Sequence, residues 1–208
     1  MINIVNLNKS FGEKTLFKDF NATINNGEFV FFTGVSGCGK TTLLNMIGSI
    51  EKVDSGKIEI DGVNIALAKN RLMLFREVYG FLFQNFALVE NKTVEENLSF
   101  ILPKFASGLT IDEALERVGL SGFQKTKIYK LSGGEQQRVA LARLILKKCS
   151  VILADEPTGS LDKNNALLVM DILKGLNKDS KTVIVVTHNE ALIENDSRVF
   201  CLGEQSLT

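Results

Sequence analysis

A glycine-rich loop between a largely apolar run and a helix-like run constrains this chain more than any other feature. The run Glu28 to Thr33 reads EFVFFT, the loop Gly34 to Thr41 reads GVSGCGKT, and a helix-like stretch, TTLLNMIG, continues from its last residue. Glycines let the backbone curl until its N–H groups point at one spot, and the helix that follows adds its dipole. The pattern G-x-x-x-x-G-K-[ST] in this context predicts a phosphate-binding loop.

The side chains of this loop have expected roles. Lys40 is expected to reach the β- and γ-phosphates of a nucleotide, and the Thr41 hydroxyl to ligate Mg²⁺. The alternative is a chance match in an ordinary glycine-rich turn, which the strand-loop-helix context disfavours. The residues expected to surround the phosphates are Gly34, Val35, Ser36, Gly37, Cys38, Gly39, Lys40, Thr41 and Thr42.

Two carboxylates follow a second apolar run. Val151 to Ala154 reads VILA, and Asp155 and Glu156 come directly after it. Because the carboxyl ends of parallel strands meet at one sheet edge, we expect this pair near the phosphate loop. Asp155 would hold Mg²⁺ through water, and Glu156 would orient and polarise an attacking water molecule. The alternative is that one carboxylate caps the next helix, and the phosphate loop favours the catalytic interpretation.

Apolar runs of strand length alternate with helix-like segments along much of the chain. Val151 to Ala154 and Thr182 to Thr187 (TVIVVT) suit parallel strands that are buried on both faces. The N-terminal part instead predicts antiparallel strands between turn signals. These strands are expected over Asn3 to Leu7, Phe17 to Ile24 and Lys57 to Asp61.

Residues from about 85 to 130 are more polar and read as a helical insert. A helix is expected after Thr93, where Glu96 completes a capping box, and another over Thr110 to Val118. The sequence thus predicts an α/β fold: a P-loop NTPase core with a mostly parallel sheet, an antiparallel β subdomain and a helical insert. The segment from Val63 to Arg76 carries no assignable pattern.

Composition excludes several functional classes. Lys plus Arg count 24 and Asp plus Glu count 24 in 208 residues, so the formal net charge is zero and no basic field attracts nucleic acid. The apolar stretches are far shorter than the roughly 18 residues of a spanning helix, and no signal peptide is evident. We therefore expect one soluble domain over residues 1–208, with no nucleic-acid partner. Its three cysteines lack metal-ligand spacing and fit a reducing compartment.

The segment Leu131 to Arg138 reads LSGGEQQR. Ser132 and Glu135 match a capping box, so a helix is expected to begin here and run to about Lys148. The cap does not explain Gly133 and Gly134, which weaken a first helical turn. Small residues at a helix start suit the close approach of an anion, and the chain already has one phosphate loop. The segment therefore predicts a second anion site that another molecule completes.

LSGGEQQR resembles the signature sequence of ATP-binding cassette (ABC) ATPases, and the resemblance extends over nearly the whole chain. Phe11 resembles the aromatic residue that stacks on adenine, and Gln84 the Q-loop glutamine. Ser160-Leu161-Asp162 resembles the D-loop. His188, the only histidine, follows TVIVVT as the family's switch histidine does, although a single histidine is ordinarily a solvated loop residue.

The resemblance implies the ABC ATPase fold and a head-to-tail homodimer around two ATP molecules with Mg²⁺. Each nucleotide would lie between the phosphate loop of one copy and the signature segment of the other. The implied catalytic residues are Glu156, His188, Gln84 and Lys40. The implied metal ligands are Thr41, Gln84 and Asp155. The implied nucleotide contacts beyond the phosphate loop are Phe11, Ser132, Gly133, Gly134, Glu135 and Asp162.

The resemblance also implies a transmembrane permease as partner, contacted through the helical insert and the Q-loop at the cytoplasmic face of the plasma membrane. ADEPTGSLD and FLFQNFALVENKTVEENL resemble the group that serves lipoprotein release, macrolide export and bacteriocin export, which favours export. The alternative is force transmission through a membrane partner without solute transport. The apolar residues Phe86, Leu88 and Val89 predict either a docking groove for the permease or the core of the insert.

Overall fold

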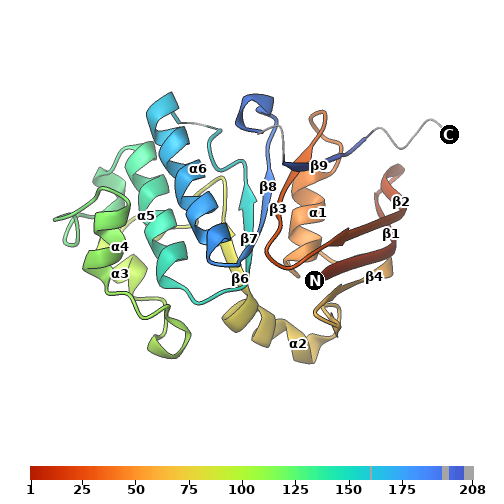
Figure 1. Ribbon diagram of the computed structural model, residues 1–208, viewed down its shortest axis with the longest axis horizontal. Coiled ribbons are helices and arrows are strands. Elements are labelled where there is room, and N and C mark those ends of the chain that lie inside the picture. Colours follow the sequence, from red (N-terminus) through yellow and green to blue (C-terminus); the bar gives the residue numbers. More distant parts are fainter. Residues whose placement is uncertain (160, 194–196, 204–208) are drawn as a thin grey trace.

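The computed structural model describes residues 1–159, 161–193 and 197–203, and they contain both predicted sheets (Figure 1). The parallel sheet has the strand order β6-β7-β8-β3-β9. Its strands are β3 (Phe29–Thr33), β6 (Tyr79–Leu82), β7 (Val151–Asp155), β8 (Thr182–Val186) and β9 (Arg198–Cys201). The antiparallel sheet has the order β2-β1-β4-β5. Its strands are β1 (Ile2–Phe11), β2 (Lys14–Ile24), β4 (Ser55–Ile60) and β5 (Val63–Asn64). The predicted P-loop NTPase core with an antiparallel β subdomain is confirmed.

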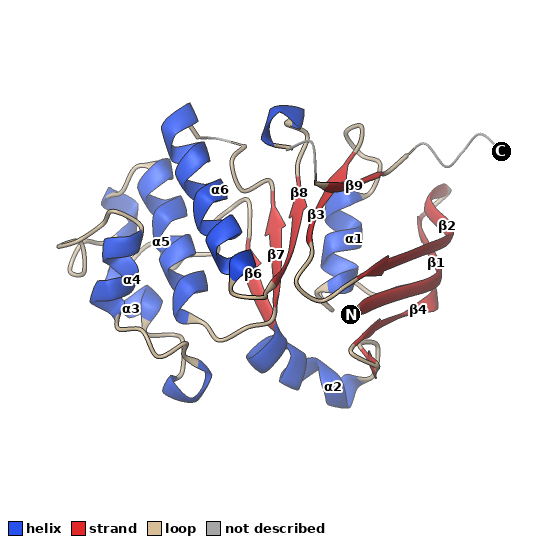
Figure 2. Ribbon diagram, viewed as in Figure 1, coloured by secondary structure: helices blue, strands red, loops and turns tan. Residues whose placement is uncertain are grey.

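The central strands are buried on both faces, as their apolar composition predicts. In β8, Val183 and Val185 join a core cluster with α5 (Gly133–Leu146) and α6 (Lys163–Lys178), whereas Ile184 and Val186 join a second cluster with α1 (Lys40–Ile47). Successive side chains of a strand point to opposite faces, so each strand supplies both clusters. Figure 2 shows α1 between the two sheets, with α5 and α6 on the other side of the parallel sheet.

The helical insert contains α3 (Val94–Leu98), α4 (Ile111–Arg117) and the 3₁₀ turns Pro103–Phe105 and Ile128–Lys130. Both expected helix starts are confirmed: Thr93 and Thr110 each accept a hydrogen bond from the backbone N–H three residues later, at 3.2 Å in both cases. The buried Asn97 side chain bonds both backbone groups of Val89, which fixes the loop before α3. Residues 119–127 form turns and loop.

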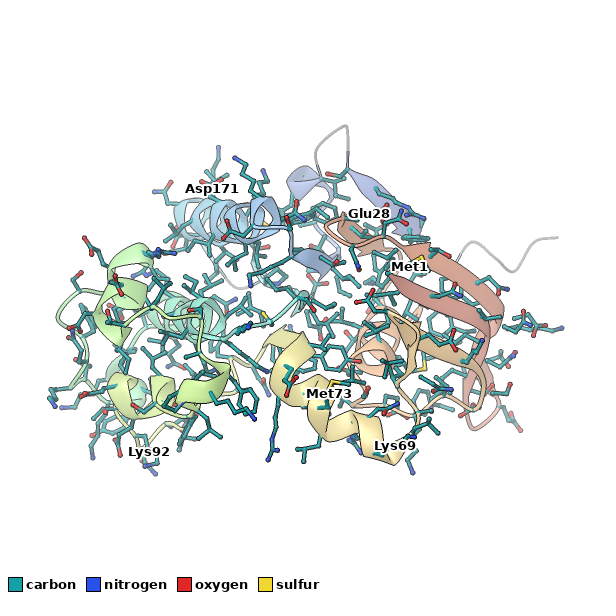
Figure 3. The ribbon with its side chains drawn as sticks, turned by 60° about the horizontal axis from the view of Figure 1, so that its bottom comes forward. Met1, Glu28, Lys69, Met73, Lys92 and Asp171 are labelled. Carbon is teal, nitrogen blue, oxygen red and sulfur yellow. The ribbon has the colours of Figure 1, made fainter. Side chains whose placement is uncertain are left out.

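Several elements are not anticipated by the sequence. Residues 63–78 form β5, then α2 (Ala68–Met73) and a π-helical turn, Leu74–Val78, which leads into β6. Neither helical turn has a side-chain cap, so the usual start signal is missing. Strand β9 is also unexpected, because its apolar residues Val199, Phe200 and Cys201 make only a short run, and three of its four residues are exposed. In Figure 3, α2 with Lys69 and Met73 runs from the antiparallel sheet towards the insert that carries Lys92.

Candidate active site

The phosphate loop connects β3 to α1 and depends on glycine conformations. Gly34, Gly37 and Gly39 have φ of 134°, 77° and 103°. A Cβ at Gly34 would lie 2.2 Å from the Leu202 carbonyl oxygen, so only glycine fits there. Helix α1 begins at Lys40 without a side-chain cap. Its first N–H groups therefore remain available to an anion, as the sequence predicts.

Lys40 is buried and its ammonium folds back onto its own loop. The Nζ donates to the carbonyl oxygens of Gly34 at 2.7 Å and Val35 at 3.0 Å, and lies 4.0 Å from Cys38 Sγ. In the described part of the chain no carboxylate forms an ion pair with Lys40. A buried cation held only by carbonyl dipoles attracts an incoming anion. Of the other predicted phosphate contacts, Val35, Ser36, Gly37 and Thr41 are exposed, Gly39 is buried, and Gly34, Cys38 and Thr42 are half-buried.

Thr41 and Asp155 meet across the parallel sheet edge, 114 residues apart in sequence. The Thr41 hydroxyl donates to Asp155 Oδ1 at 2.9 Å. Burial raises the pKa of the Asp155 carboxyl, and the neighbouring Glu156 carboxylate raises it further, while the bond from Thr41 and the Lys40 charge lower it. Bringing a positive charge beside Asp155 would relieve the cost of burying its negative charge.

Glu156 follows β7 in a left-handed conformation with φ of 45°, a strained geometry typical of functional sites. Its Oε1 lies 2.8 Å from His188 Nδ1, which ties the carboxylate to the loop after β8. Its Oε2 is buried and has no hydrogen-bond partner among the described residues. A hollow of about 470 Å³ lies here, lined by Glu156, Thr158, Gly159, Leu161, His188 and Asn189. An unpaired buried acceptor beside a hollow is suited to binding water.

The signature segment begins α5 with the expected capping box. Ser132 Oγ accepts from the Glu135 backbone N–H at 3.3 Å, and the Ser132 N–H donates to Glu135 Oε2 at 2.7 Å. A Cβ at Gly133 would meet nothing within 4 Å, so space is open in front of this helix start. No hydrogen bond among the described residues joins this segment to the phosphate loop or to the acidic pair. The nearest link that the hydrogen bonds show is from Gln137, whose side chain donates to the carbonyl of Pro157, the residue after Glu156, at 2.9 Å.

Asp162 caps α6 and is linked to the signature helix. Its Oδ1 accepts from the backbone N–H groups of Asn164 and Asn165, each at 3.0 Å. The Asn165 side chain also accepts from Arg138, and its amide nitrogen is the nearest atom that a Cβ at Gly134 would meet. Asn165 was not anticipated because no motif marks it. Ser160, the first residue of the resembled D-loop, lies outside the described residues.

Phe11 and Gln84 lie at the ends of β1 and β6. Phe11 is 51% exposed, and Lys9 Nζ lies 4.7 Å from its ring centroid, so one face of the ring meets a cation. Lys9 itself is held by Glu51 at 2.7 Å and Asp54 at 3.3 Å. Gln84 is exposed, and no hydrogen bond among the described residues joins its side chain to Asp155 or Glu156. Hydrogen bonds therefore join Thr41 to Asp155 and Glu156 to His188, whereas none of those among the described residues brings in Gln84.

The apolar residues after Gln84 divide into two kinds. Phe86 and Leu88 are half-buried and pack against the core cluster that joins the insert to α5, α6 and one face of the parallel sheet, whereas Val89 is 44% exposed. For Phe86 and Leu88 this packing favours the core interpretation over a docking groove.

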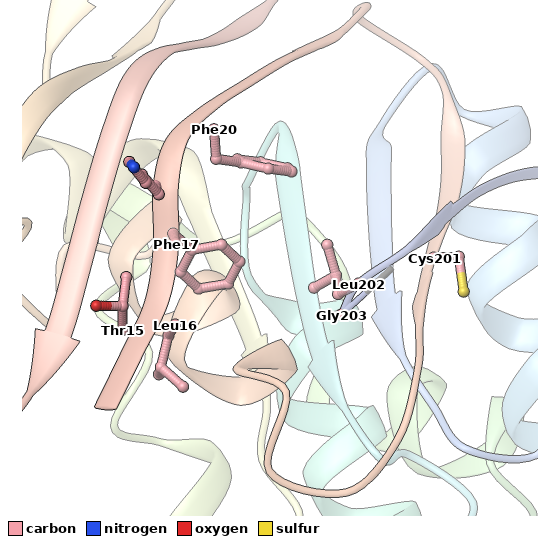
Figure 4. Close-up of a pocket in the computed structure, with 8 residues that line it drawn as sticks. Thr15, Leu16, Phe17, Phe20, Cys201, Leu202 and Gly203 are labelled. Carbon is pink, nitrogen blue, oxygen red and sulfur yellow. The ribbon is translucent and has the colours of Figure 1, made fainter. Parts of the chain in front are cut away.

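A second hollow, of about 250 Å³, lies between β2 and Cys201–Gly203 (Figure 4). It borders the phosphate loop, because the carbonyl of Leu202 is the atom that limits Gly34. Its lining is largely apolar and includes Leu16, Phe17, Phe20 and Leu202. Lys18 is the cation in this lining that could attract a phosphate. Phosphate chemistry is expected at the sheet edge and not here.

The oxygen atoms of Thr41, Asp155 and Glu156 form the donor set at the sheet edge, and oxygen donors suit a hard cation such as Mg²⁺. The described residues contain no cluster of three or more His, Cys, Asp or Glu side chains able to hold a metal alone. A cation at this edge would therefore share its coordination with nucleotide phosphates and water, as Mg²⁺ does in many phosphate sites. The residues present fit the ion.

Comparisons with known proteins agree with this geometry. A sequence profile of the ABC transporter family matches residues 17–159. The chain is 39% identical over 208 residues to the lipoprotein-releasing system ATP-binding protein LolD of Bacteroides fragilis, covering 95% of both chains. It is 37% identical to the macrolide export ATP-binding/permease protein MacB of Mannheimia succiniciproducens, and spans about a third of that protein's length (33%).

Solved structures extend the similarity to the whole fold. The dimeric ABC transporter cassette MJ0796 matches with a TM-score of 0.87 and 36% identity, over 97% of this chain and 94% of that one. A dimeric post-hydrolysis state of MJ0796, bound to ADP and Pi, matches with a TM-score of 0.84 and 35% identity over the same shares. In the described part of this chain, no helix combines the length and apolarity needed to cross a bilayer.

Proposed function

The chain belongs to the ABC transporter family and is an ATPase of that family, and from this premise we propose that it couples hydrolysis of Mg-ATP in a homodimer to a membrane permease. Residues 1–208 would act as one domain, with a helical subdomain over about residues 85–130. The observation that carries the proposal is a pair of anion-facing halves that no hydrogen bond among the described residues joins. Lys40, Thr41, Asp155 and Glu156 form one half, and the open start of α5 at Ser132 forms the other.

Nucleotide binding would exchange the internal contacts of the phosphate loop for phosphate contacts. Lys40 Nζ would leave the carbonyls of Gly34 and Val35 for the β- and γ-phosphate oxygens, with which it forms stronger charge-assisted bonds. The loop N–H groups and the start of α1 would bind the remaining oxygens. The free face of the Phe11 ring, opposite Lys9, would stack on the adenine.

Thr41 and Asp155 would hold Mg²⁺ together with ATP, and Gln84 would join them once its loop moves. Bound Mg²⁺ supplies positive charge that neutralises charge developing on the transferred phosphoryl group. Glu156 would accept a proton from the attacking water through the buried Oε2, while Oε1 stays on His188. His188 orients this carboxylate and would contact the γ-phosphate from its exposed side.

A second copy would complete the site. Ser132, Gly133 and Gly134 of one chain would approach the γ-phosphate held by the other, with Glu135 holding the cap in shape. Asp162 would align this segment through Asn165. The dimeric cassette MJ0796 supports this arrangement by its similarity.

The partner would be a permease, and the direction export. MacB is named as a combined ATP-binding and permease protein, and the present chain spans only a third of it (33%). The permease would bind this domain at the cytoplasmic face of the plasma membrane. Val89, Phe100 and Leu102 of the insert are 44%, 50% and 57% exposed, and we expect a permease segment to cover them.

Two measurements test this function. With Mg-ATP, the turnover per chain should rise with protein concentration, because monomers hold only half of each site, and chelation of Mg²⁺ should abolish it. Turnover per chain that stays constant over the dilution range would contradict the shared site. A tagged chain should also co-purify from membranes with a multi-span protein. A chain that is recovered without any membrane partner would contradict the permease proposal and leave the ATPase intact.

A further inference from the structure

The loop that follows Gln84 has an unusual backbone. Phe86 and Ala87 are consecutive non-glycine residues in the left-handed region, with φ of 61° and 48°. Residues with a Cβ avoid this region, and single examples persist only where surrounding contacts hold them. Two in succession require a specific restraint. The restraint comes from α5, the helix that begins at the signature segment.

Arg143 supplies that restraint. Its Nη1 donates to the Ala87 carbonyl at 2.5 Å and its Nη2 to the Phe86 carbonyl at 2.8 Å. One planar guanidinium thus binds the carbonyls of both strained residues. In the described residues no carboxylate forms an ion pair with Arg143, and burial lowers its pKa. These two carbonyls are therefore the main compensation for a half-buried cation.

The C-terminal end of α5 also binds the turn that precedes β6. Lys147, four residues after Arg143, donates to the Phe75 carbonyl of the π-helical turn at 2.5 Å. Between these anchors, β6 packs so closely that a Cβ at Gly80 would lie 2.4 Å from Leu144 Cδ1. Helix α5 is therefore fixed to both ends of the strand that leads to Gln84. Arg143 lies eleven residues beyond the Ser132 cap, which is roughly 16 Å along the helix.

We propose that Arg143 is a positioning residue, whose guanidinium holds the loop after Gln84 in its strained conformation and so couples this loop to the signature helix. The coupling rests on the proposed function, in which Gln84 serves the chain's own nucleotide and Ser132 serves its partner's. A shift of α5 when the partner's ATP binds moves the guanidinium, and the strained loop then moves with it. One site thereby influences the position of Gln84 at the other.

Arg143→Lys tests the clamp, since lysine keeps the charge but presents one ammonium in place of a planar fork. The amides of residues 85–88 should exchange with solvent faster, and turnover should fall about tenfold, because one charge-assisted contact no longer restrains the loop. Lys148→Met is the matched control: it removes an exposed cation beside the same helix and should change neither measurement. If Arg143→Lys does not fold, Arg143→Gln replaces it with the same expected results.

Glycine separates a positioning role from a purely structural one. Ala87→Gly removes the cost of the left-handed conformation, so in the Arg143→Lys background it should restore most of the lost turnover. Ala106→Gly, at an ordinary φ of −82°, should restore none. Unchanged exchange in Arg143→Lys, or no recovery with Ala87→Gly, would overturn the proposal. Absence of hydrolysis by the wild-type chain would instead contradict the proposed function, and the exchange measurement would still report on the clamp.

Discussion

Helices α4 and α5 begin with the same cap and differ in the residues that follow it. At α4 the Thr110 N–H donates to Glu113 Oε2 at 2.7 Å, and at α5 the Ser132 N–H donates to Glu135 Oε2 at 2.7 Å. In both helices this backbone bond is the main reason that the pKa of the glutamate is lowered. The caps are thus equivalent as helix-starting devices.

The first turns of the two helices are not equivalent. Helix α4 continues with Ile111 and Asp112, and α5 with Gly133 and Gly134. Asp112 is a carboxylate that would repel a phosphate, whereas a side chain at Gly133 would meet only open space. A cap explains why each helix begins where it does. Only the glycines indicate that the start of α5 serves a ligand.

The largest expected effect comes from Glu156, the carboxylate of the site that the start of α5 in a second copy would complete. Glu156→Gln keeps the size of the side chain but removes the proton acceptor, so turnover should fall by about 10²–10⁴-fold. The ATP-bound dimer should then accumulate. Hydrogen exchange in this variant with ATP should slow at residues 132–135 and stay unchanged at residues 110–113. Equal protection of both helix starts would contradict the proposal that only the start of α5 binds a nucleotide.

The next effect comes from the ammonium in the phosphate loop. Lys40→Ala removes one charge-assisted contact with the phosphates, which predicts roughly 10- to 150-fold weaker ATP binding by calorimetry. Without bound ATP, residues 132–135 should lose their protection. Protection that persists in this variant would mean that α5 responds to something other than nucleotide.

Aspartate substitutions at the two N-cap residues compare the roles of the two helix starts. Aspartate is an effective N-cap, but in both helices the hydroxyl that it replaces also donates to the capping-box glutamate at 2.8 Å, so Ser132→Asp and Thr110→Asp should lower the melting temperature by similar amounts. Ser132→Asp places a negative charge where the partner's phosphate would lie, and its turnover should fall about tenfold or more. Thr110→Asp should leave turnover unchanged. Equal loss in both variants would show that the two starts have the same role.

The smallest effect is on stability in acid, measured at the third capping box. The Thr93 N–H and the Lys92 ammonium lower the pKa of Glu96 from 4.5 to about 2. Since the folded pKa is below the unfolded one, this contribution is complete above 4.5 and is lost as pH falls towards 2. The melting-temperature difference between wild type and Glu96→Gln should therefore be constant near neutral pH and shrink across that window. A difference that grows in acid would contradict the assignment.

The sequence predicts best what local chemistry determines. The four central residues of TVIVVT are all apolar, so the strand has apolar side chains on both of its faces. Its burial between helices on both sides follows directly. The caps at Thr93, Thr110 and Ser132 follow from residue types three positions apart. Strand β9 was missed because its four residues are mostly exposed and its place at the sheet edge comes from pairing with β3 alone.

Contacts to backbone atoms account for most of what the sequence leaves out. Arg143 binds the carbonyls of Phe86 and Ala87, and carbonyls carry no residue-specific signal. Asn165 bonds to Asp162 and to Arg138, and Arg138 lies 27 residues before it, so this link depends on a fold that must first be known. The role of Gln84 stays a prediction, because its side chain is exposed and no hydrogen bond among the described residues joins it to the acidic pair.

A mixing assay tests the shared site most directly. One chain carries Lys40→Ala and the other Ser132→Arg, and each homodimer then has two damaged sites. In the mixed dimer, one site combines both changes and the other combines an intact phosphate loop with an intact signature segment. The account predicts that mixing the two inactive proteins with Mg-ATP restores measurable turnover. If Ser132 served its own chain's nucleotide, every site in the mixture would be damaged, and the absence of any recovered turnover would contradict the account.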